Sequence, residues 1–429
     1  MAIGGTFLTH NKVLPGAYIN FVSKARALGG ISDRGVAAIA MKMSWGAEGK
    51  IQTIYSEDVE KKALEIFGYS YTSDELKPIR EIFKNAKELK FFRLGTGNKA
   101  TVTIGGLNAT AIYGGARGND IKIKISRNLD DNNFTIFTYM EDSLVDEQLV
   151  SNINEIINNK FVSFTGEGEL TATAGTNLSG GADDVANKEE YSKFLEAIES
   201  ETFNVLIYDG DDDVTKRLFT SFTKRLRDDE GVKFISVLHN YTKADYEGIV
   251  SLKNNKELIY WLGGALAGAE VNESITNKKY DGEYEFDAKF SNSELKDAVK
   301  NGELVFYYDS GNKKVLKDIN TFTSFSTDKN SDFSNNQIIR VLDATANDVA
   351  RIFNDYYLGK MQNDELGRDI FKAEVINYFR QLQSIRAIDN FNDNDVEISK
   401  GTEKGDVVLD VLIEPVACMD KLYMKCVIE

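Results

Sequence analysis

Short apolar runs separated by amphipathic helical patterns dominate much of this chain. Residues 35–41, 203–208 and 232–238 do not alternate between apolar and polar side chains, which is typical of strands buried on both faces. Between the last two runs, Val214, Leu218 and Phe222 recur at helical spacing. This strand–helix–strand order leaves room for a right-handed crossover and predicts a parallel sheet covered by helices. Similar periods predict further helices over about 57–67, from a Ser73 cap onward, over 347–358 and over 369–388.

The segment 96–183 follows a different pattern, in which apolar and polar residues alternate over short stretches. Residues 101–104, 121–125 and 134–137 each show this period of two, which predicts strands. A helix is expected only over Asp142–Asn158. Glycines mark both ends of the segment, so we expect a β-rich domain inserted into the α/β core.

Both ends of the chain are predicted to be extended. A short strand is expected over 17–22, and two more over 406–413 and 421–428, on either side of Pro415. The predicted fold class is therefore α/β (α+β), a mixed-sheet core with an inserted β-rich domain and strand-like terminal arms. Its parts are an N-terminal arm over 1–20, the core over 21–95 and 184–405, the insertion over 96–183, and a C-terminal arm over 406–429.

Charge and hydropathy exclude several classes of partner. The chain of 429 residues carries 67 acidic and 51 basic side chains, a net charge of −16, so we predict no nucleic-acid partner. The apolar run 258–268 is about 11 residues long, too short to span a bilayer, so no membrane insertion is expected. The first residues lack a basic segment followed by an apolar one, which favours synthesis in the cytoplasm.

Cysteine and histidine usage argues against disulfides and structural zinc. Cys418 and Cys426 lie in one strand-like segment, roughly 26 Å apart when extended, and cannot bond to each other without folding back. With only two histidines in the chain, few zinc ligands remain.

The most enzyme-like motif is an apolar strand that runs into the acidic stretch 209–213. It resembles the first motif of haloacid-dehalogenase-type phosphatases, in which one Asp attacks phosphorus and a second acts as acid or base. Asp209 and Asp211 would form that pair, but Asp213 stands where a Thr or Val is usual. Acids of a loop and a first helical turn, favoured by the helix dipole, explain the same residues more simply.

Other catalytic patterns are incomplete. An EF-hand loop starting at Asp209 would need glycine where Val214 stands. The Gly-rich segments 114–118 and 263–268 match no phosphate-loop pattern, and the second favours close packing of a buried helix. His239 ends a predicted strand with no Ser or Cys elbow nearby. We therefore predict no catalytic, cofactor or metal site, and expect a protein that acts through its surfaces rather than an enzyme.

Several segments, in order along nearly the whole chain, resemble one protein family. They are Pro15–Phe21, Tyr113–Ile121 with its glycine turn, Trp261–Gly268, Asn272–Thr276, Ile319–Thr323, Gly359–Asn363, and Ile413–Ala417 with Met419, Lys421 and Tyr423. Together they resemble the contractile tail sheath proteins of tailed bacteriophages and of R-type, phage-tail-like bacteriocins, in the branch found in Gram-positive bacteria.

This resemblance implies a structural subunit that polymerises helically around a tail tube and contracts to drive the tube through a target cell envelope, without a cofactor. Its partners would be other copies of itself, the tail tube protein, and baseplate and tail terminator proteins. The particle, a virion tail or tail-like particle, would be assembled in the bacterial cytoplasm and released.

The resemblance also implies that each subunit donates its arms as added strands to the sheets of its neighbours. The implied interface residues are Tyr18, Ile19, Phe21, Leu412, Leu422, Tyr423, Met424, Val427 and Ile428. Two further hypotheses are that the 96–183 domain faces outward, and that the region 347–363 contacts the tube. The alternative function is a phosphatase that uses Asp209 and Asp211.

Overall fold

The computed structural model describes residues 4–5, 17–18, 30–128, 133–184 and 188–428, and these fall into two units. The main unit holds the described residues of 33–347, 385–389 and 414–428. The hairpin unit holds the described residues of 1–32, together with 348–384 and 390–413. The division falls inside helix α7 (Asn336–Ile352), between Asn347 and Asp348.

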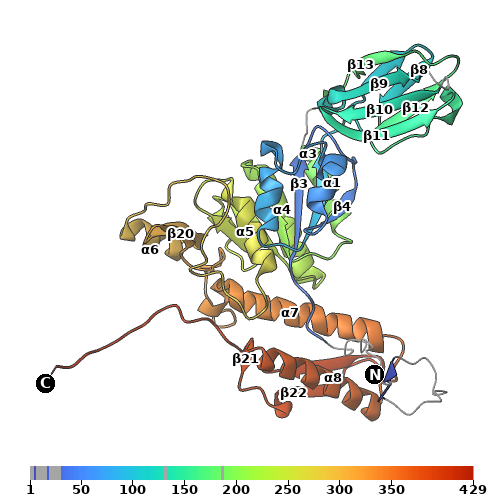
Figure 1. Ribbon diagram of the computed structural model, residues 1–429. Helices are drawn as coiled ribbons and strands as arrows, with labels where there is room; N and C mark the ends of the chain where they lie inside the picture. The colour runs from blue at the N-terminus through green and yellow to red at the C-terminus, as the bar shows by residue number, and fades with distance from the viewer. Residues whose placement is uncertain (1–3, 6–16, 19–29, 129–132, 185–187, 429) are drawn as a thin grey trace. The chain divides into compact units, whose positions relative to one another are not determined.

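A seven-stranded sheet forms the centre of the main unit, in the order β18-β17-β16-β15-β3-β5-β4 (Figure 1). Neighbouring strands run parallel except β4, which is antiparallel to β5 at the sheet edge. The strands are β3 (Val36–Lys42), β4 (Ile51–Tyr55), β5 (Glu88–Leu94), β15 (Val205–Ile207), β16 (Ile235–His239), β17 (Ile249–Leu252) and β18 (Glu303–Leu304). The predicted α/β class is confirmed.

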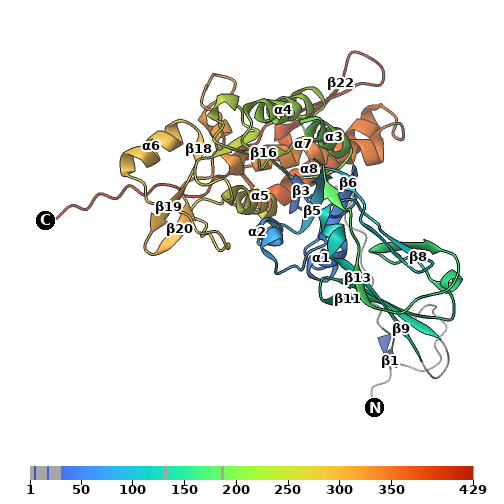
Figure 2. The same cartoon turned by 90° about the horizontal axis from the view of Figure 1, so that it is seen from above.

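Helices cover both faces of this sheet, as Figure 2 shows from above. Helices α1 (Val59–Phe67), α2 (Lys77–Phe83) and α5 (Leu258–Gly268) lie on one side, and α3 (Lys188–Ile198) and α4 (Asp213–Lys224) on the other. Alternate residues of β3 accordingly belong to two different hydrophobic clusters: Ala37 and Ile39 to one, Ala38 and Ala40 to the other. Burial on both faces explains why these strands read as uninterrupted apolar runs.

Two small sheets within residues 97–183 pack around a core of their own. The first has the order β12-β8-β7 and the second β11-β10-β9-β13, and a short pair, β14 and β6, lies at the ends of the segment. The strands are β6 (Gly97–Asn98), β7 (Thr101–Ile104), β8 (Leu107–Ala111), β9 (Ile121–Arg127), β10 (Phe134–Met140), β11 (Ser143–Val150), β12 (Val162–Gly166), β13 (Thr173–Asn177) and β14 (Ala182–Asp183). Their inward residues, with Trp45 of the preceding segment, form the third hydrophobic cluster.

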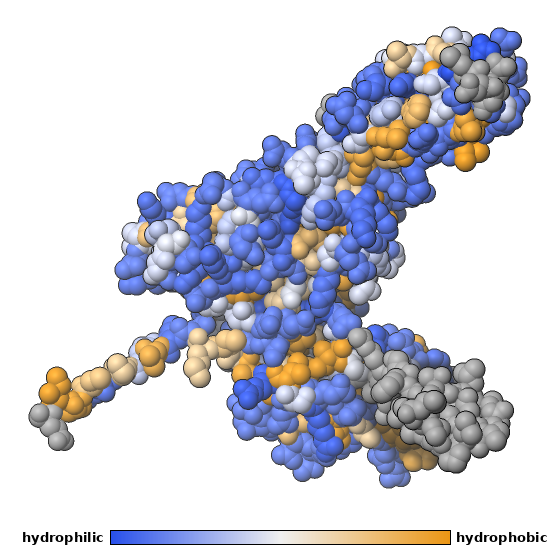
Figure 3. Space-filling view, viewed as in Figure 1, coloured by the Kyte–Doolittle hydropathy of each residue, from blue (hydrophilic) through white to orange (hydrophobic). Residues whose placement is uncertain are grey.

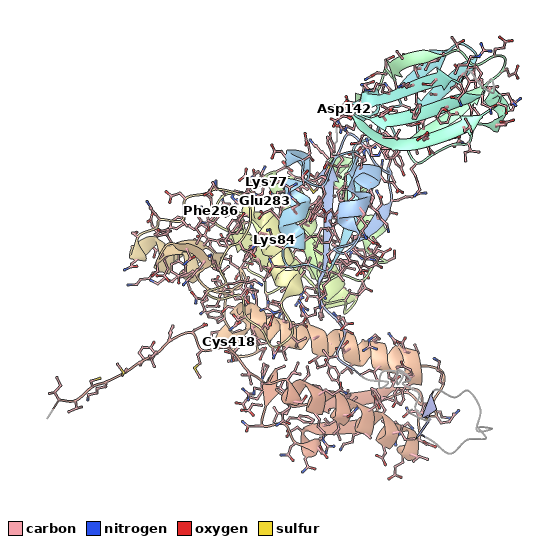
Figure 4. The ribbon with its side chains drawn as sticks, viewed as in Figure 1. Lys77, Lys84, Asp142, Glu283, Phe286 and Cys418 are labelled. Atoms are coloured by element: carbon pink, nitrogen blue, oxygen red, sulfur yellow. The ribbon has the colours of Figure 1, made fainter. Side chains whose placement is uncertain are left out.

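The helix predicted over Asp142–Asn158 is wrong. Residues 143–150 form β11, which pairs along its length with β10, and only Ile153–Glu155 make one turn of 3-10 helix. Asp142, labelled in Figure 4, follows Glu141, whose positive φ of 52° turns the chain back between the two strands. Pairing with a distant strand therefore overrides the local helical period.

Two arginines fasten the β-rich segment to the residues around it. Arg93, almost fully buried, donates from Nη2 to the Gly114 carbonyl at 2.8 Å, and Arg117 donates from Nε to the Gly68 carbonyl at 2.7 Å. A Cβ on Gly114 would lie 2.0 Å from the Gly97 carbonyl oxygen, so this crossing of backbones requires glycine. The glycines at this joint thus serve close backbone approach.

The rest of the main unit is α6 (Asn292–Lys300), the hairpin β19 (Phe306–Asp309) and β20 (Asn312–Val315), and the pair β21 (Ile388–Asp389) and β24 (Glu414–Pro415). The hairpin unit contains the end of α7, a π-helical turn (Phe353–Tyr357), α8 (Glu365–Ser384), and the antiparallel strands β22 (Val396–Lys400) and β23 (Val407–Val411). Helices were predicted over 347–358 and 369–388, but α7 begins earlier, at Asn336, and α8 ends earlier, at Ser384. No helix among the described residues is long and apolar enough to cross a bilayer.

Candidate assembly surfaces

The start of the C-terminal tail is tethered to the main unit. The Cys418 amide donates to Oε1 of Gln337 at 2.9 Å, and Lys317 Nζ lies 3.8 Å from Oδ2 of Asp420. Just before them, β24 pairs antiparallel with β21. Figure 4 labels Cys418 at this tethered base. The tail is therefore anchored as far as Asp420.

Residues 421–428, the described part of the tail beyond Asp420, form no strand and no backbone pairing. The strand predicted over 421–428 is therefore not formed in the single chain, because the ladder hydrogen bonds of a strand need a neighbouring strand. We call residues 421–428 the free arm. Its large apolar and aromatic side chains are 77–94% exposed: Leu422, Tyr423, Met424, Val427 and Ile428. Figure 3 shows hydrophobic residues towards the end of the tail.

In an extended conformation the free arm presents two rows of side chains. The even row, Leu422, Met424, Cys426 and Ile428, is wholly apolar. The odd row, Lys421, Tyr423, Lys425 and Val427, alternates basic with apolar or aromatic residues. Apolar side chains and unpaired backbone groups together make a segment that favours pairing with another strand.

Among the described strands, β22 and β23 pair only with each other, so the outer edge of each is free of any other described strand. Their hairpin is a sheet of only two strands, packed on α8 through one face, with Val396 fully buried. The other face is exposed and carries Glu397, Ser399, Val408 and Asp410. Two strands with one covered face form a marginal sheet, which a further strand would stabilise.

The register shows which backbone groups of β23 are unused. The Leu412 amide donates to the Asp395 carbonyl at 2.9 Å, just past the pair Val396 and Val411. In an antiparallel sheet, facing residue pairs alternate between pairs that are hydrogen-bonded to each other and pairs whose backbone groups point outward. The backbone groups of Val407, Leu409 and Val411 therefore point away from β22. Leu412, one of the predicted interface residues, is 72% exposed at the end of this edge.

Little of the predicted N-terminal arm can be placed. Gly4–Gly5 and Ala17–Tyr18 form β1 and β2, a short parallel pair, and Tyr18 belongs to β2. Ile19 and Phe21 lie outside the described residues.

The acidic stretch 209–213 lies at the carboxyl ends of β15 and β16, and its side chains have partners. Asp209 accepts a hydrogen bond from the Tyr260 hydroxyl at 3.0 Å, and burial raises the pKa of Asp209. Asp211 bonds His239 Nδ1 at 2.8 Å and lies 3.4 Å from Lys256 Nζ. Burial acts to raise the pKa of Asp211, but the hydrogen bond from His239 and the charge of Lys256 outweigh it and hold that pKa below its usual range.

The neighbouring acids stabilise α4. Asp212 caps the helix by accepting from the amide and hydroxyl of Thr215, both at 2.8 Å, and Asp213 pairs with Lys243 at 3.2 Å. The interpretation of these residues as acids of a loop and a first helical turn is confirmed. Within the described ranges, no group of three or more His, Cys, Asp or Glu side chains is arranged to hold a metal ion.

Comparison with known proteins accounts for nearly the whole chain. Residues 34–94 match the tail sheath protein Gp18 domain III N-terminal region, 95–183 the phage tail sheath protein beta-sandwich domain, 184–321 the phage tail sheath protein central domain, and 328–429 the phage tail sheath C-terminal domain. The phage-like element PBSX protein XkdK of Bacillus subtilis is 35% identical over 98% of this chain and 99% of its own length. The chain belongs to the phage tail sheath family.

Solved structures agree with this assignment. The sheath tail protein of Desulfitobacterium hafniense is 39% identical, with a TM-score of 0.83 over 95% of this chain and 99% of that one. The sheath tail protein Lin1278 of Listeria innocua is 33% identical, with a TM-score of 0.80 over 92% of this chain and 94% of that one. The resemblance found from the sequence is therefore confirmed, and the protein is a tail sheath subunit of a virion or tail-like particle.

Membership of a structural family agrees with the interpretation of Asp209 and Asp211 as structural residues. A tail sheath family is not known for enzymatic activity. The half-buried Asp209 accepts a hydrogen bond from Tyr260, and Asp211 contacts His239 and Lys256. Such contacts are expected of structural residues in a loop at the carboxyl end of a central strand.

The exposed face of the hairpin is a candidate surface that the sequence prediction did not include. The hairpin residues Glu397, Val408 and Asp410 were not among the predicted interface residues. The sequence pattern that points to this face lies in residues 406–412, Asp-Val-Val-Leu-Asp-Val-Leu. Its even-numbered residues are alternately acidic and apolar. That pattern alone does not show that residues 407–411 pair with residues 396–400 to form a two-stranded sheet.

The loop Gly359–Asn363 lines a shallow groove of the hairpin unit. Phe353, Tyr357 and Phe371 form its aromatic wall, and Val407 its edge at the start of β23. The groove thus lies within and beside the region 347–363, for which tube contact was hypothesised.

Proposed function

We propose that this sheath subunit polymerises helically around a tail tube through exchanged terminal strands, and contracts to drive the tube through a target cell envelope. The observation that carries the proposal is that one chain holds both an unpaired apolar arm and a two-stranded hairpin with free edges. The arm has no neighbouring strand to pair with, and the described hairpin has no third strand beside it. Pairing between them would therefore supply the missing backbone hydrogen bonds of both.

Strand addition follows from the chemistry of these two surfaces. An arm that pairs with a sheet edge gains a ladder of main-chain hydrogen bonds and buries its apolar row. The eight residues of the free arm span roughly 26 Å when extended, and a five-residue strand such as β23 spans roughly 17 Å. The arm is therefore long enough to cover the strand.

The contact is heterologous, since arm and hairpin are different surfaces of the same chain. Heterologous contacts that do not close into a ring generate helices, the geometry that a sheath requires. The anti-feeding prophage sheath, whose structure is described as helical and contracted, shares the fold at 12% identity with a TM-score of 0.58. In our proposal, arms hold the lattice together while the folded bodies change their contacts during contraction, and energy stored at assembly drives the change.

The remaining parts of the proposal concern placement and partners. The 96–183 domain faces outward, the region 347–363 contacts the tail tube protein, and baseplate and tail terminator proteins bind the ends of the polymer. Cross-linking that joined the 96–183 domain to the tube would contradict the first placement. Charge reversals within 347–363 that left tube binding unchanged would contradict the second.

The test is electron microscopy and sedimentation velocity of the full chain, compared with a chain that lacks residues 421–429. We expect hollow tubes or filaments from the full chain, and monomers with an unchanged melting temperature from the truncated chain, because the removed side chains that the structure describes are exposed. A full chain that stays monomeric at high concentration, even with a tail tube present, would rule out the proposal.

A further inference from the structure

One face of the sheet β11-β10-β9-β13 points away from the core of the β-rich segment. The inner face contributes Ile123, Ile136 and Val150 to the third hydrophobic cluster. Because successive side chains of a strand alternate between the two faces, the residues between the inward ones point outward. On β11 these include Leu144 and Leu149, which are 50% and 62% exposed. Exposed apolar side chains gathered on one face are typical of a contact surface.

The register of β9, β10 and β11, which lie side by side in Figure 1, arranges the outward residues in three rows. Each row crosses the strands in that order. The rows are Lys122, Tyr139 and Leu144; Lys124, Phe137 and Glu147; and Ser126, Thr135 and Leu149. We call these nine residues the outer face. It therefore has cations on one side, aromatic rings in the middle, and leucines with one acid on the other side.

The aromatic rings at the centre of the outer face pack against each other and against the lysines. The ring centroids of Phe137 and Tyr139 are 6.3 Å apart. Lys122 Nζ lies 5.4 Å from the ring centroid of Tyr139, and Lys124 Nζ lies 5.5 Å from that of Phe137. Such cation–π contacts hold the lysine stems along the rings. The centre is therefore an apolar platform with ammonium groups at its edge.

The middle row carries two opposite charges that cannot pair within one chain. Lys124 and Glu147 lie on either side of Phe137, two strand spacings apart, which is roughly 9–10 Å. Among the described residues, neither forms an ion pair. In the next row, Lys122 lies 3.7 Å from Asp142, which Figure 4 labels. Lys124 and Glu147 are thus open to charges from another molecule.

A second copy of the same face meets this charge pattern when it is turned about a two-fold axis that runs along β10. Its β9 then lies over β11, its β11 lies over β9, and the rows keep their order. Lys124 of each copy faces Glu147 of the other, and the two Phe137 rings meet at the axis. A two-fold axis across the strands would instead set Lys124 over Lys124, which is repulsive. Charge complementarity therefore selects the axis along the strands.

We propose that two copies of this chain pair through their outer faces, with the apolar centres in contact and with two ion pairs between Lys124 and Glu147. The two sheets would pack as aligned layers, about 30° apart in strand direction. This contact has a two-fold axis, whereas a helix built from heterologous contacts is polar and has none between its subunits. It therefore joins free chains, or chains of two different particles, and does not depend on the proposed strand exchange.

The size of the outer face predicts a weak contact. Three strands about 4.8 Å apart and about seven residues long cover roughly 14 by 24 Å, or ~340 Å² on each copy. A typical stable interface buries about 800 Å² on each partner. Free chains should therefore pair only at high concentration. Two polymers that present many copies side by side would gain from multivalency.

The test is chemical cross-linking of the full chain through a cysteine at the two-fold axis. Thr135→Cys is introduced on β10, and the exposed Cys418 and Cys426 are replaced by serine. A short bismaleimide should join two copies of this reference chain. Added singly, Lys124→Glu and Glu147→Lys should each raise the protein concentration for half-maximal cross-linking about ten-fold or more, since like charges then face each other.

Mixing the two charge variants should restore cross-linking, because one copy then offers two acids and the other offers two lysines. A chain that carries both substitutions should also cross-link like the reference chain. Matched controls are Lys99→Glu and Glu169→Lys, which reverse the charge of exposed residues of the same segment outside the three strands. We expect both controls to leave cross-linking unchanged. Equal melting temperatures identify the variants that stay folded.

The outcomes decide between the two contacts. Cross-linking that is lost in each single variant and restored by mixing supports the face-to-face pair. No cross-linking of the reference chain, or equal cross-linking of every variant, would overturn it and leave strand exchange standing. Filaments that disappear on removal of residues 421–429 while cross-linking persists would support both contacts as separate surfaces.

Discussion

At the scale of single residues, a buried ion pair joins two distant parts of the main unit. Arg227, in the π-helical turn Arg225–Asp229 after α4, donates two hydrogen bonds to Asp343 of α7, at 2.7 and 2.8 Å. Both side chains are buried. Burial acts to lower the pKa of Arg227, but the charge of Asp343 and its hydrogen bond outweigh burial and raise that pKa, so the guanidinium stays charged.

Removing one partner of this pair should be costly. We expect Arg227→Met to lower the free energy of unfolding by about 3–5 kcal/mol, because Asp343 is left buried and uncompensated. The double variant Arg227→Met with Asp343→Leu should recover much of that loss, since no charge remains to be desolvated. Chemical denaturation measures both. Equal destabilisation by the single and double variants would show that lost packing, not the unpaired charge, dominates.

At the scale of elements, helix α5 depends on glycines for its packing. A Cβ on Gly264 would lie 2.3 Å from the carbonyl oxygen of Ile82, and one on Gly268 would lie 2.1 Å from that of Asn85. Both neighbours are backbone atoms at the end of α2 or just after it. The expectation that segment 263–268 allows close packing of a buried helix is confirmed, and the α2–α5 contact needs small residues.

This contact predicts different costs for two adjacent glycines. Gly264→Ala should destabilise the chain by about 1–3 kcal/mol, because the added methyl group meets backbone that can move only if α2 moves. Gly263→Ala should cost less, since its methyl group would meet the Ile207 side chain, which can change rotamer. Both gain the same helix propensity from alanine, about 1 kcal/mol. Thermal melting that ranked the two variants in the opposite order would contradict this explanation.

Patterns of burial within one element were predictable from sequence, and pairing between distant elements was not. The runs at 35–41, 203–208 and 232–238 predict strands because burial on both faces removes alternation, and they contain most or all of β3, β15 and β16. The error at 142–158 arose because Leu144, Val145 and Leu149 fit a helical period as well as a strand. Pairing with β10 stabilises the strand conformation of residues 143–150, and the local sequence pattern contains no information about that pairing.

The same distinction, between patterns within one element and pairing between distant elements, applies to the candidate assembly surfaces. The apolar arm was recognised because it is a continuous local pattern at the end of the chain. The hairpin was not predicted as a candidate surface, because that role depends on β23 pairing with β22 alone among the described strands. The free edge is a property of the sheet and not of residues 406–412 alone.

At the scale of the whole molecule, the net charge of −16 opposes self-association. Copies repel one another over the Debye length, which is about 30 Å at 0.01 M salt and about 8 Å at 0.15 M. The proposed joint between arm and hairpin would act at short range through main-chain hydrogen bonds and apolar contacts. Salt should therefore screen it less than it screens the repulsion between bodies.

Assembly should therefore be favoured by moderate salt. We expect the critical concentration of the unmodified chain to fall between about 0.01 and 0.15 M NaCl, as screening removes the repulsion between bodies. Light scattering against protein concentration at each salt level measures it. A critical concentration that rose steadily with salt would show that attraction between opposite charges, rather than repulsion, sets the balance.

In a polymer joined through arms and hairpin edges, each subunit inside the polymer pairs its arm with one neighbour and its hairpin edge with another. The subunit at either end lacks one of these neighbours. A stack joined in this manner has polarity: one end always displays unfilled edges, and the other always displays unused arms. Growth and termination are then chemically distinct events. A protein that starts the polymer and one that stops it need opposite surfaces, one offering a strand and the other accepting one.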